Sequence, residues 1–290
     1  MDDSSPIVAP GCLYVVALPI GNRDDITLRA LKILEGVDLI AAEDTRTAKL
    51  MLSEYGIKNR LTAYHEHNES EKTSELVTHL VGKNSLALVS DAGTPLVSDP
   101  GYRLVSAASE KGIRVVPIPG ASAAIAALSV SGLPTNAFTF AGFMPKKKGK
   151  RVELLHTYAA SNGTVIFYES PKRVLSLMKE LVAVFGDRPA FFSREMTKKF
   201  EEFLRGRLSG ILATLSERRS IKGECTLIVS AGGHRVATGI DEIRAALIDE
   251  MKTTGARPSE VAGAVARRYG LPKGRVYDEL LNLKKSTPGP

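Results

Sequence analysis

Residues 89–101 of the chain read VSDAGTPLVSDPG, and this stretch decides the fold. It follows a short apolar run at 86–89 that is typical of a buried parallel strand, and it precedes a helical pattern over 102–111. Loops at the carboxyl ends of parallel strands bring backbone polar groups to the crevice where open α/β sheets bind ligands. A Gly/Pro-rich loop can also serve merely as a turn. Because this one is long and carries aspartates and hydroxyls, we expect a ligand site.

Strands and helices alternate on both sides of this loop. Strands are predicted at 13–18, 37–41, 61–64, 86–89 and 113–117, with helical patterns between them. Polar clusters at 42–46 and 65–69 follow two of these strands. The alternation predicts a parallel, right-handed α/β layer.

A second part of the chain begins after a Gly/Pro turn at 117–120 and a helix of small residues at 121–128. Strands are predicted at 137–143, 164–168, 190–193, 202–203 and 225–230, and helices at 151–160, 174–185 and 209–218, as in an α+β domain. From residue 241 the pattern is purely helical, with a restart after Gly270 that resembles a helix-turn-helix. We expect a leader at 1–11, domains at 12–118 and 119–235, and helices at 240–285.

The amino-acid composition limits the classes of protein to which the chain can belong. The 290 residues are 43% hydrophobic and 24% charged, which is typical of an ordinary soluble protein without a membrane segment. Cys12 and Cys225 are expected to be buried thiols in a reducing compartment, so we expect a cytoplasmic protein. The first ten residues indicate a disordered leader. A net charge of +7 would suit a polyanionic partner.

Several familiar signatures are absent from the sequence. It contains no dinucleotide fingerprint, no P-loop, no nucleophile elbow and no acidic-x-G-x-G methyltransferase motif. His65 and His67 stand two positions apart without further ligands nearby in the sequence, so we expect a hydrogen-bonding loop rather than a metal site there.

A basic run lies beside the expected domain boundary. It consists of Lys146, Lys147, Lys148, Lys150 and Arg151. Such a run is often a solvated loop. Next to a ligand cleft, we favour contact with RNA phosphates.

Nine short motifs, taken together, carry a family resemblance. They are PIGN at 19–22, DITLRA at 25–30, EDTR at 43–46, HEHNE at 65–69, SDAGTPLVSDPG at 90–101, PG at 119–120, SGL at 131–133, FYESPKR at 167–173 and REMTK at 194–198. The chain resembles the ribosomal RNA small subunit methyltransferase I family of the tetrapyrrole-methylase superfamily. The resemblance covers about 13–232, and the last helices resemble the small helical region that ends that family.

The resemblance implies two α/β domains with S-adenosylmethionine in the cleft between them, usually in a homodimer. The implied reaction is 2′-O-methylation of a cytidine ribose in the decoding centre of 16S rRNA. The first loop departs from the tetrapyrrole pattern G-x-G-x-G-D, because Pro19 and Asn22 replace two of its positions while Gly21 and Asp25 remain. This departure favours RNA over a corrin precursor.

The resemblance also implies the site residues. The cofactor-binding set is Asp91, Ala92, Gly93, Thr94, Leu96, Ser122, Ala123 and Tyr168. The reaction needs a group that takes the hydroxyl proton, and the catalytic candidates are Glu43, Asp44, Arg46, His65 and Asn68. The substrate is expected to meet Asn22, Arg23 and the basic run.

The sequence leaves several alternatives open. It does not choose a base among the candidates, and Asp44 and Arg46 can instead form an ion pair that supports their loop. The terminal helices either help to dock the substrate or simply pack on the body. Two rival functions remain: a tetrapyrrole methyltransferase of the same fold, and a noncatalytic RNA-binding assembly factor.

Overall fold

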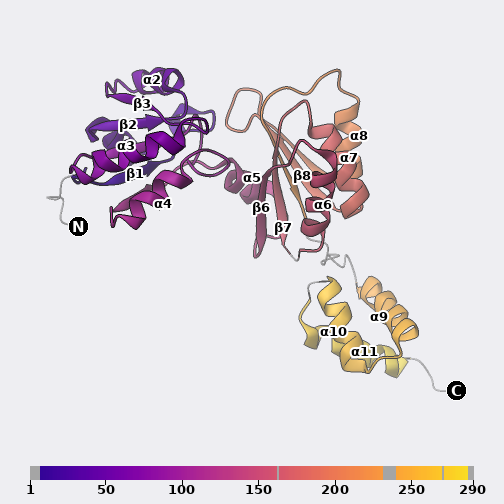
Figure 1. The fold of residues 1–290 in the computed structure, drawn as a ribbon. Coiled ribbons are helices and arrows are strands. Elements are labelled where there is room, and N and C mark those ends of the chain that lie inside the picture. Colours follow the sequence, from indigo (N-terminus) through magenta and orange to yellow (C-terminus); the bar gives the residue numbers. More distant parts are fainter. Residues whose placement is uncertain (1–6, 162, 231–239, 270, 287–290) are drawn as a thin grey trace.

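The computed structural model describes residues 7–161, 163–230, 240–269 and 271–286. The first residues of the expected leader, the expected boundary at 235 and the helix break at Gly270 lie outside these ranges. Figure 1 shows two sheet-containing halves and a separate group of three helices.

The first half is built on a five-stranded parallel sheet. Its strands are β1 (Leu13–Val16), β2 (Leu39–Ala42), β3 (Leu61–Ala63), β4 (Leu86–Val89) and β5 (Val115–Ile118), in the order β3-β2-β4-β1-β5. Every pairing in it is parallel, which confirms the predicted α/β layer. All five carboxyl ends therefore lie along one edge of the sheet.

Helices cover both faces of this sheet (Figure 1). They are α1 (Leu28–Gly36), α2 (Thr45–Glu54), α3 (Glu69–Val81) and α4 (Tyr102–Glu110), with a short 3-10 turn η1 (Arg23–Asp25) before α1. Alternate residues of β4 point to opposite faces. Ala87 and Val89 pack with the side chains of α1 and α2, whereas Leu86 and Leu88 pack with those of α3 and α4.

The second half contains a mixed sheet. Its strands are β6 (Phe138–Phe143), β7 (Thr164–Glu169), β8 (Pro189–Arg194), β9 (Glu202–Arg207) and β10 (Cys225–Val229), in the order β6-β7-β10-β8-β9. Strands β6 and β7 are parallel, and the other three pairings are antiparallel. Since β10 runs against β7 and β8, its amino end lies at the same edge as their carboxyl ends.

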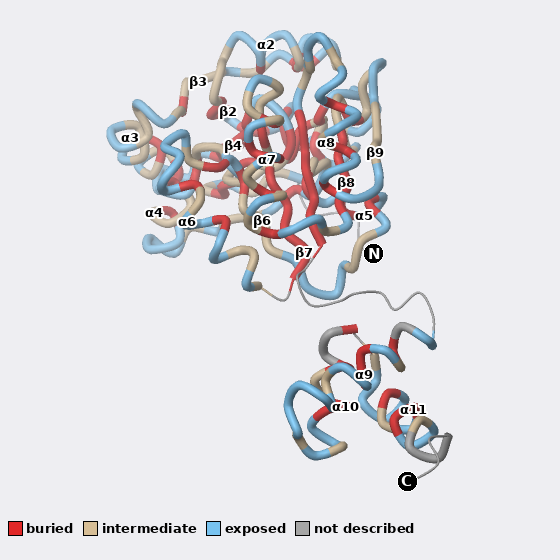
Figure 2. Tube along the Cα trace, turned by 90° about the vertical axis from the view of Figure 1, so that its right-hand side faces the viewer, coloured by how far each residue is buried: buried red, intermediate tan, exposed pale blue. Residues whose placement is uncertain are grey.

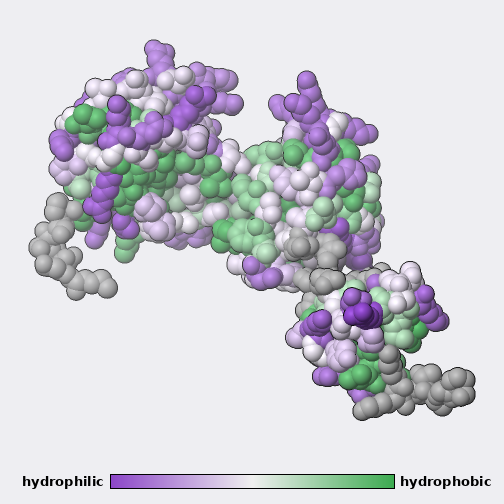
Figure 3. All heavy atoms as spheres, turned by 60° about the horizontal axis from the view of Figure 1, so that its bottom comes forward, coloured by the Kyte–Doolittle hydropathy of each residue, from purple (hydrophilic) through white to green (hydrophobic). Residues whose placement is uncertain are grey.

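Helix α5 (Ala123–Ser131) lies between the two sheets, and α6 (Lys148–Ala159), α7 (Val174–Phe185) and α8 (Leu208–Ser216) cover the far face of the second sheet (Figure 1). The small side chains of α5 pack closely on one face of that sheet, against Ile166, Phe191 and Ile228. Strands β7, β8 and β10 form the buried centre of this sheet (Figure 2). Seen from below, hydrophobic residues gather where the two halves face one another (Figure 3).

Two element boundaries differ clearly from the sequence prediction. Helix α6 begins at Lys148 rather than at 151, so part of the basic run is helical. Strand β9 extends to Arg207 rather than ending near 203. It is an edge strand with exposed Arg205 and Arg207, and such charged edge residues hide the apolar alternation that marks a strand.

The last three helices are α9 (Ile240–Thr254), α10 (Pro258–Tyr269) and α11 (Lys273–Ser286). Their hydrophobic cluster is built from their own side chains, with Leu247, Val265 and Leu280 at its centre. Figure 2 shows the group set apart from the two sheets. The three helices therefore form a core of their own.

Across the described ranges, no helix is long and apolar enough to cross a bilayer.

A second contact joins the two halves besides the chain itself. We call it the clasp, and it consists of Gly21 and Asn22 from the loop after β1 with Thr197 and Lys198 from the loop after β8. The backbone N–H of Asn22 donates to Thr197 Oγ1 at 3.0 Å. Lys198 passes over Gly21 so closely that a Cβ there would lie 2.4 Å from Lys198 Cγ. Carboxylates of Glu195 and Glu224 hold the Lys198 ammonium at 3.1 and 3.0 Å.

The close approach of Lys198 to Gly21 in the clasp predicts how a substitution there changes stability. In Gly21→Ala, Lys198 must leave its two carboxylates or the two halves must separate slightly. We expect a loss of about 1–3 kcal/mol in the free energy of unfolding, as for other overpacked sites. Urea denaturation and the midpoint of thermal unfolding measure it.

Gly149→Ala is the matched control, because Gly149 lies in α6 with no atom near its would-be Cβ. There the substitution is expected to be neutral or to stabilise by up to about 1 kcal/mol. Equal stability of the two variants would show that Lys198 does not need its place over Gly21.

Candidate functional site

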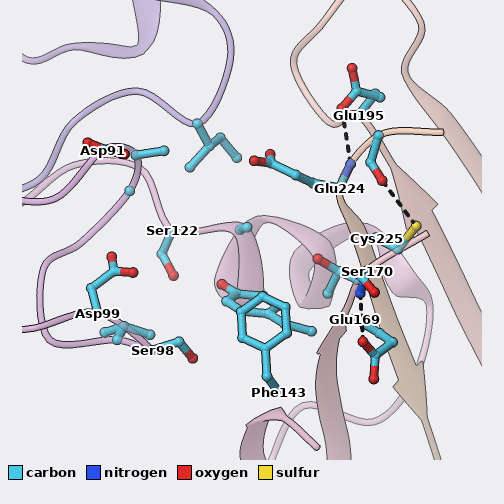
Figure 4. Close-up of a pocket in the computed structure, with 18 of the residues that line it drawn as sticks. Asp91, Ser98, Asp99, Ser122, Phe143, Glu169, Ser170, Glu195, Glu224 and Cys225 are labelled. Carbon is cyan, nitrogen blue, oxygen red and sulfur yellow. Dashed lines mark hydrogen bonds between the residues drawn. The ribbon is translucent and has the colours of Figure 1, made fainter. Parts of the chain in front are cut away.

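A cavity of about 630 Å³ lies where the edges of the two sheets meet. One wall comes from the strand-end loops of the first sheet, and the other from the ends of β6, β7 and β8 and the start of β10 (Figure 4). Its lining is Ile20, Glu43, Asp91, Ala92, Gly93, Thr94, Val97, Ser98, Asp99, Ser122, Ala123, Phe143, Tyr168, Glu169, Ser170, Pro171, Glu195, Lys198, Gly223, Glu224, Cys225 and Thr226. A concave site of this size suits a small-molecule ligand.

The loop after β4 is fixed by the loops that follow three other strands. Gly93 exchanges two backbone hydrogen bonds with Leu18, of 2.8 and 3.1 Å. Thr94 Oγ1 donates to the carbonyl of Ala121 at 3.1 Å, and Asp91 Oδ1 accepts the backbone N–H of Asp44 at 3.3 Å. The loop is thus held by bonds to the segments after β1, β2 and β5.

The backbone of this loop is unusual. Gly93 and Gly101 have φ values of 73° and 139°, and Leu96 and Ser98 also lie at φ of 72° and 71°. A left-handed conformation costs a residue other than glycine roughly 1–2 kcal/mol. Such conformations persist where the surroundings determine them, and they cluster at functional sites.

Three carboxylates of the first wall stand close together, and no basic side chain among the described residues pairs with them. Burial raises the pKa of Glu43, and the charges of Asp99 and Asp91 add to this effect. Partial burial also raises the pKa values of Asp91 and Asp99, with a further contribution from neighbouring carboxylates. Each of these groups favours a positive charge beside it.

The second wall carries carboxylates that are already paired. Lys198 forms ion pairs with both Glu195 and Glu224. The buried Glu169 accepts the Ser170 N–H at 2.7 Å and lies 2.9 Å from Arg173. Burial raises the pKa of the Cys225 thiol to about 12. The thiol therefore stays protonated and unreactive in this wall of the cavity.

Seven of the eight predicted cofactor residues line the cavity, and their cofactor contacts stay a prediction. Ser122 and Ala123 stand at the start of α5, and Tyr168 reaches them from β7, where its hydroxyl accepts the Ala124 N–H at 2.9 Å. Leu96 is the exception. A Cβ on Gly101 would meet Leu96 Cδ1 at 2.9 Å, so the Leu96 side chain lies beside Gly101 among core residues rather than in the cavity. The contact of Leu96 with the cofactor stays a prediction.

The catalytic candidates separate into two groups. Glu43 lines the cavity. The carboxylate of Asp44, in contrast, accepts hydrogen bonds from the backbone N–H and the guanidinium of Arg46, at 2.7–3.1 Å. This ion pair lowers the pKa of Asp44, and the Arg46 side chain is 88% exposed. Asp44 also caps α2. The geometry favours the alternative in which this pair supports its loop.

His65 and Asn68 belong to the turn after β3. Asn68 Oδ1 accepts the His65 N–H at 2.8 Å, and its amide donates to the Ala63 carbonyl at 3.1 Å. Neither side chain lines the cavity. Over the part of the chain that is described, no group of three or more His, Cys, Asp or Glu side chains could hold a metal ion.

The predicted substrate residues of the first loop have structural partners. Asn22 takes part in the clasp and caps η1 by accepting the Asp24 N–H at 3.1 Å. Arg23 forms an ion pair with Glu54. Both remain exposed on the surface near the cavity mouth.

The basic run is corrected at one residue. Lys146, Lys147, Lys148 and Lys150 are exposed, but Arg151 is 9% exposed. Its guanidinium binds both carboxylate oxygens of Glu180 at 2.6 and 2.7 Å. Arg151 therefore ties α6 to α7 and offers little charge to a substrate.

Sequence reasoning missed Asp99, Phe143, Glu169 and the segment 223–226 as lining residues. The motifs at 167–173 and 194–198 were a signal for the second wall, since they end β7 and β8. The segment 223–226 gave no such signal, because it precedes a strand and reaches the cavity only through the antiparallel pairing of β10.

Solved structures share the fold. A crystal structure of uroporphyrin-III C-methyltransferase from Thermus thermophilus, complexed with S-adenyl homocysteine, superposes with a TM-score of 0.52 at 20% identity, over 75% of this chain and 96% of that one. A cobalt precorrin-4 methyltransferase gives a TM-score of 0.54 at 16% identity, over 76% and 95%.

Curated relatives are much nearer in sequence. A protein of Mesorhizobium japonicum named ribosomal RNA small subunit methyltransferase I is 46% identical, over 95% of this chain and 93% of that protein. One of the same name from Haemophilus influenzae is 45% identical, over 95% and 98%. The family model of tetrapyrrole (corrin/porphyrin) methylases matches residues 12–212. The chain therefore belongs to the ribosomal RNA small subunit methyltransferase I family, within the tetrapyrrole methylases.

Proposed function

We propose that this protein transfers the methyl group of S-adenosylmethionine to 16S rRNA of the small ribosomal subunit, at the 2′-oxygen of a cytidine in the decoding centre. The observation that carries the proposal is the acidic cavity between the two sheets, in a chain whose relatives are named for methylation of this RNA. Its assembly as a homodimer is proposed from the family resemblance.

The cavity residues fit this cofactor. Its sulfonium and ammonium groups are cationic, and Glu43, Asp91 and Asp99 supply carboxylates in a partly shielded place. Among the described lining residues Lys198 is the one basic side chain, and two carboxylates engage it. The Ser122 side chain does not cap α5, and of the first N–H groups of this helix that of Ala124 binds Tyr168, so the positive end of the helix dipole suits a carboxylate.

The bound cofactor supplies an electrophilic methyl carbon. The protein must then take the proton from the ribose 2′-hydroxyl. We assign this role to Glu43, whose carboxylate lies in the cavity with a raised pKa, as expected of a general base that works near neutral pH. Asp99 is the second candidate because it shares both properties.

The central test measures transfer of labelled methyl from S-adenosylmethionine to purified small subunits that lack the modification. We expect label in 16S rRNA, at one ribose 2′-oxygen that nuclease digestion and mass spectrometry locate. Label on a corrin precursor instead would favour the tetrapyrrole alternative. RNA binding without any transfer would favour the noncatalytic assembly factor.

The proposed base makes a pH prediction. Its carboxylate works only when deprotonated, and its pKa in the free enzyme is raised above the ordinary 4.5. We therefore expect kcat/KM, which reports the titration of the free enzyme, to fall with decreasing pH at a higher pH than an ordinary glutamate would give. Glu43→Gln should lower kcat by roughly 100- to 10,000-fold at saturating cofactor. Methyl-transfer assays over a pH series, at limiting and at saturating cofactor, measure both effects.

Asp99→Asn sharpens this test, because it removes a charge that repels the Glu43 carboxylate. If Glu43 is the base, Asp99→Asn keeps methyl transfer, and the acidic limb of the pH–rate profile moves to lower pH. Glu35→Gln, an exposed change on α1, is the control. Full kcat in Glu43→Gln would remove Glu43 from the mechanism.

The exposed lysines make a binding prediction. Replacing Lys146, Lys147, Lys148 and Lys150 by Gln should weaken binding to small subunits and reduce the slope of log K against log salt by up to about 0.7–0.9 for each phosphate that is no longer neutralised. Cofactor affinity should stay unchanged.

The control removes equal charge elsewhere, from the exposed Lys32, Lys49, Lys58 and Lys111. Filter binding across a salt series and isothermal titration with the cofactor separate the two effects. An equal loss of RNA affinity in both quadruple variants would leave the basic run with no special part in substrate binding.

A further inference from the structure

An aromatic ring stands open at the mouth of the cavity. Phe143 lines the cavity and is nevertheless 57% exposed. Figure 4 shows the ring between the loop that carries Ser98 and the end of β7 at Glu169. Leaving a large apolar side chain in water is unfavourable, and such exposure beside a pocket marks a binding surface.

The strand aims this ring by means of a bulge. The β6–β7 register shifts between Phe140 and Gly142, and Gly142 has φ of 61°. A Cβ at Gly142 would lie 3.0 Å from Ser98 Oγ, so the bulged strand passes close to the loop after β4. Bulges often re-aim a side chain beside an active site. Here the bulge immediately precedes Phe143.

A second aromatic ring supports Phe143 from one side. The ring centroids of Phe143 and Tyr168 are 5.7 Å apart with the planes at 62°, an edge-to-face contact. Tyr168 is itself fixed by its hydrogen bond with the Ala124 N–H and by a similar contact with Phe140 at 4.9 Å. Phe143 is therefore held in place while more than half of its surface stays free.

Charged side chains of both signs belong to the surroundings of this ring. The carboxylates of Glu43 and Asp99 line the same cavity and suit a cation. Beyond Phe143 the chain continues within a few residues into the exposed Lys146, Lys147 and Lys148. A neutral aromatic surface next to lysines matches single-stranded nucleic acid, whose bases stack on aromatic rings while its phosphates meet basic side chains.

We propose that Phe143 is the stacking platform for the nucleobase of the nucleotide to be methylated. This inference rests on the proposed function and adds a substrate-positioning residue to it. A nucleotide that leaves the RNA stack to enter the cavity loses the stacking of its base on its neighbours. The Phe143 ring takes the place of the neighbouring bases. Because every base has a π-face, stacking here holds the nucleotide without choosing its identity.

Four substitutions at Phe143 test the proposal by methyl transfer to small subunits. Phe143→Ala and Phe143→Leu should raise KM for the subunits roughly 5- to 100-fold, because neither keeps an aromatic face. Phe143→Tyr and Phe143→Trp should stay near wild type. The dissociation constant for S-adenosylmethionine should be unchanged in all four variants.

Phe138→Ala is the matched control, because Phe138 lies at the other end of β6 and is 44% exposed. It should leave KM for the subunits unchanged. Wild-type activity in Phe143→Leu would overturn the proposal, since apolar bulk alone would then suffice. A weaker cofactor affinity in Phe143→Ala with unchanged KM for the subunits would also overturn it and assign the ring to the cofactor. A wild-type protein without transfer to small subunits would refute the proposed function itself, and the stacking role with it.

Discussion

The structure of the site depends on one constraint, the fixing of the loop after β4 by its neighbours. Gly93 pairs with Leu18 through two backbone hydrogen bonds, and Thr94 and Asp91 bind the segments that follow β5 and β2. These bonds hold Leu96 and Ser98 in a left-handed backbone that would be unfavourable in a free loop. One wall of the cavity is therefore set mainly by backbone geometry, which side-chain motion disturbs little.

The second wall follows a different principle. The first sheet is parallel, so all its strands contribute carboxyl ends to one edge, whereas the second sheet brings the ends of β6, β7 and β8 together with the start of β10. This wall carries paired charges, such as Lys198 with Glu195 and Glu224, while the carboxylates of the first wall have no basic partner among the described residues. The cavity thus has one side whose carboxylates are engaged by basic residues and one side whose carboxylates suit a cationic ligand.

Sequence reasoning predicted the elements that local patterns determine, including the strand at 86–89 and the loop behind it. It could not show that the Leu96 side chain packs beside Gly101, because a left-handed φ at a residue other than glycine leaves no mark in sequence. Arg151 was misread for a similar reason: its partner Glu180 is 29 positions away and meets it only after α6 packs on α7. The segment 223–226 became a lining segment through antiparallel pairing, which periodicity does not reveal.

The clasp has a consequence for the exchange of ligand. The chain crosses from the first sheet to the second at α5, so Asn22 and Thr197 belong to parts that are already tethered. Because the two parts are tethered, the contact between them is intramolecular and needs far less affinity than the association of separate molecules. The ion pairs of Lys198 with Glu195 and Glu224 lie within the second half, so the hydrogen bond from Asn22 to Thr197, worth about 1 kcal/mol, is a weak link between the two halves. A link of this size lets the loops part and meet again while α5 keeps the two halves joined.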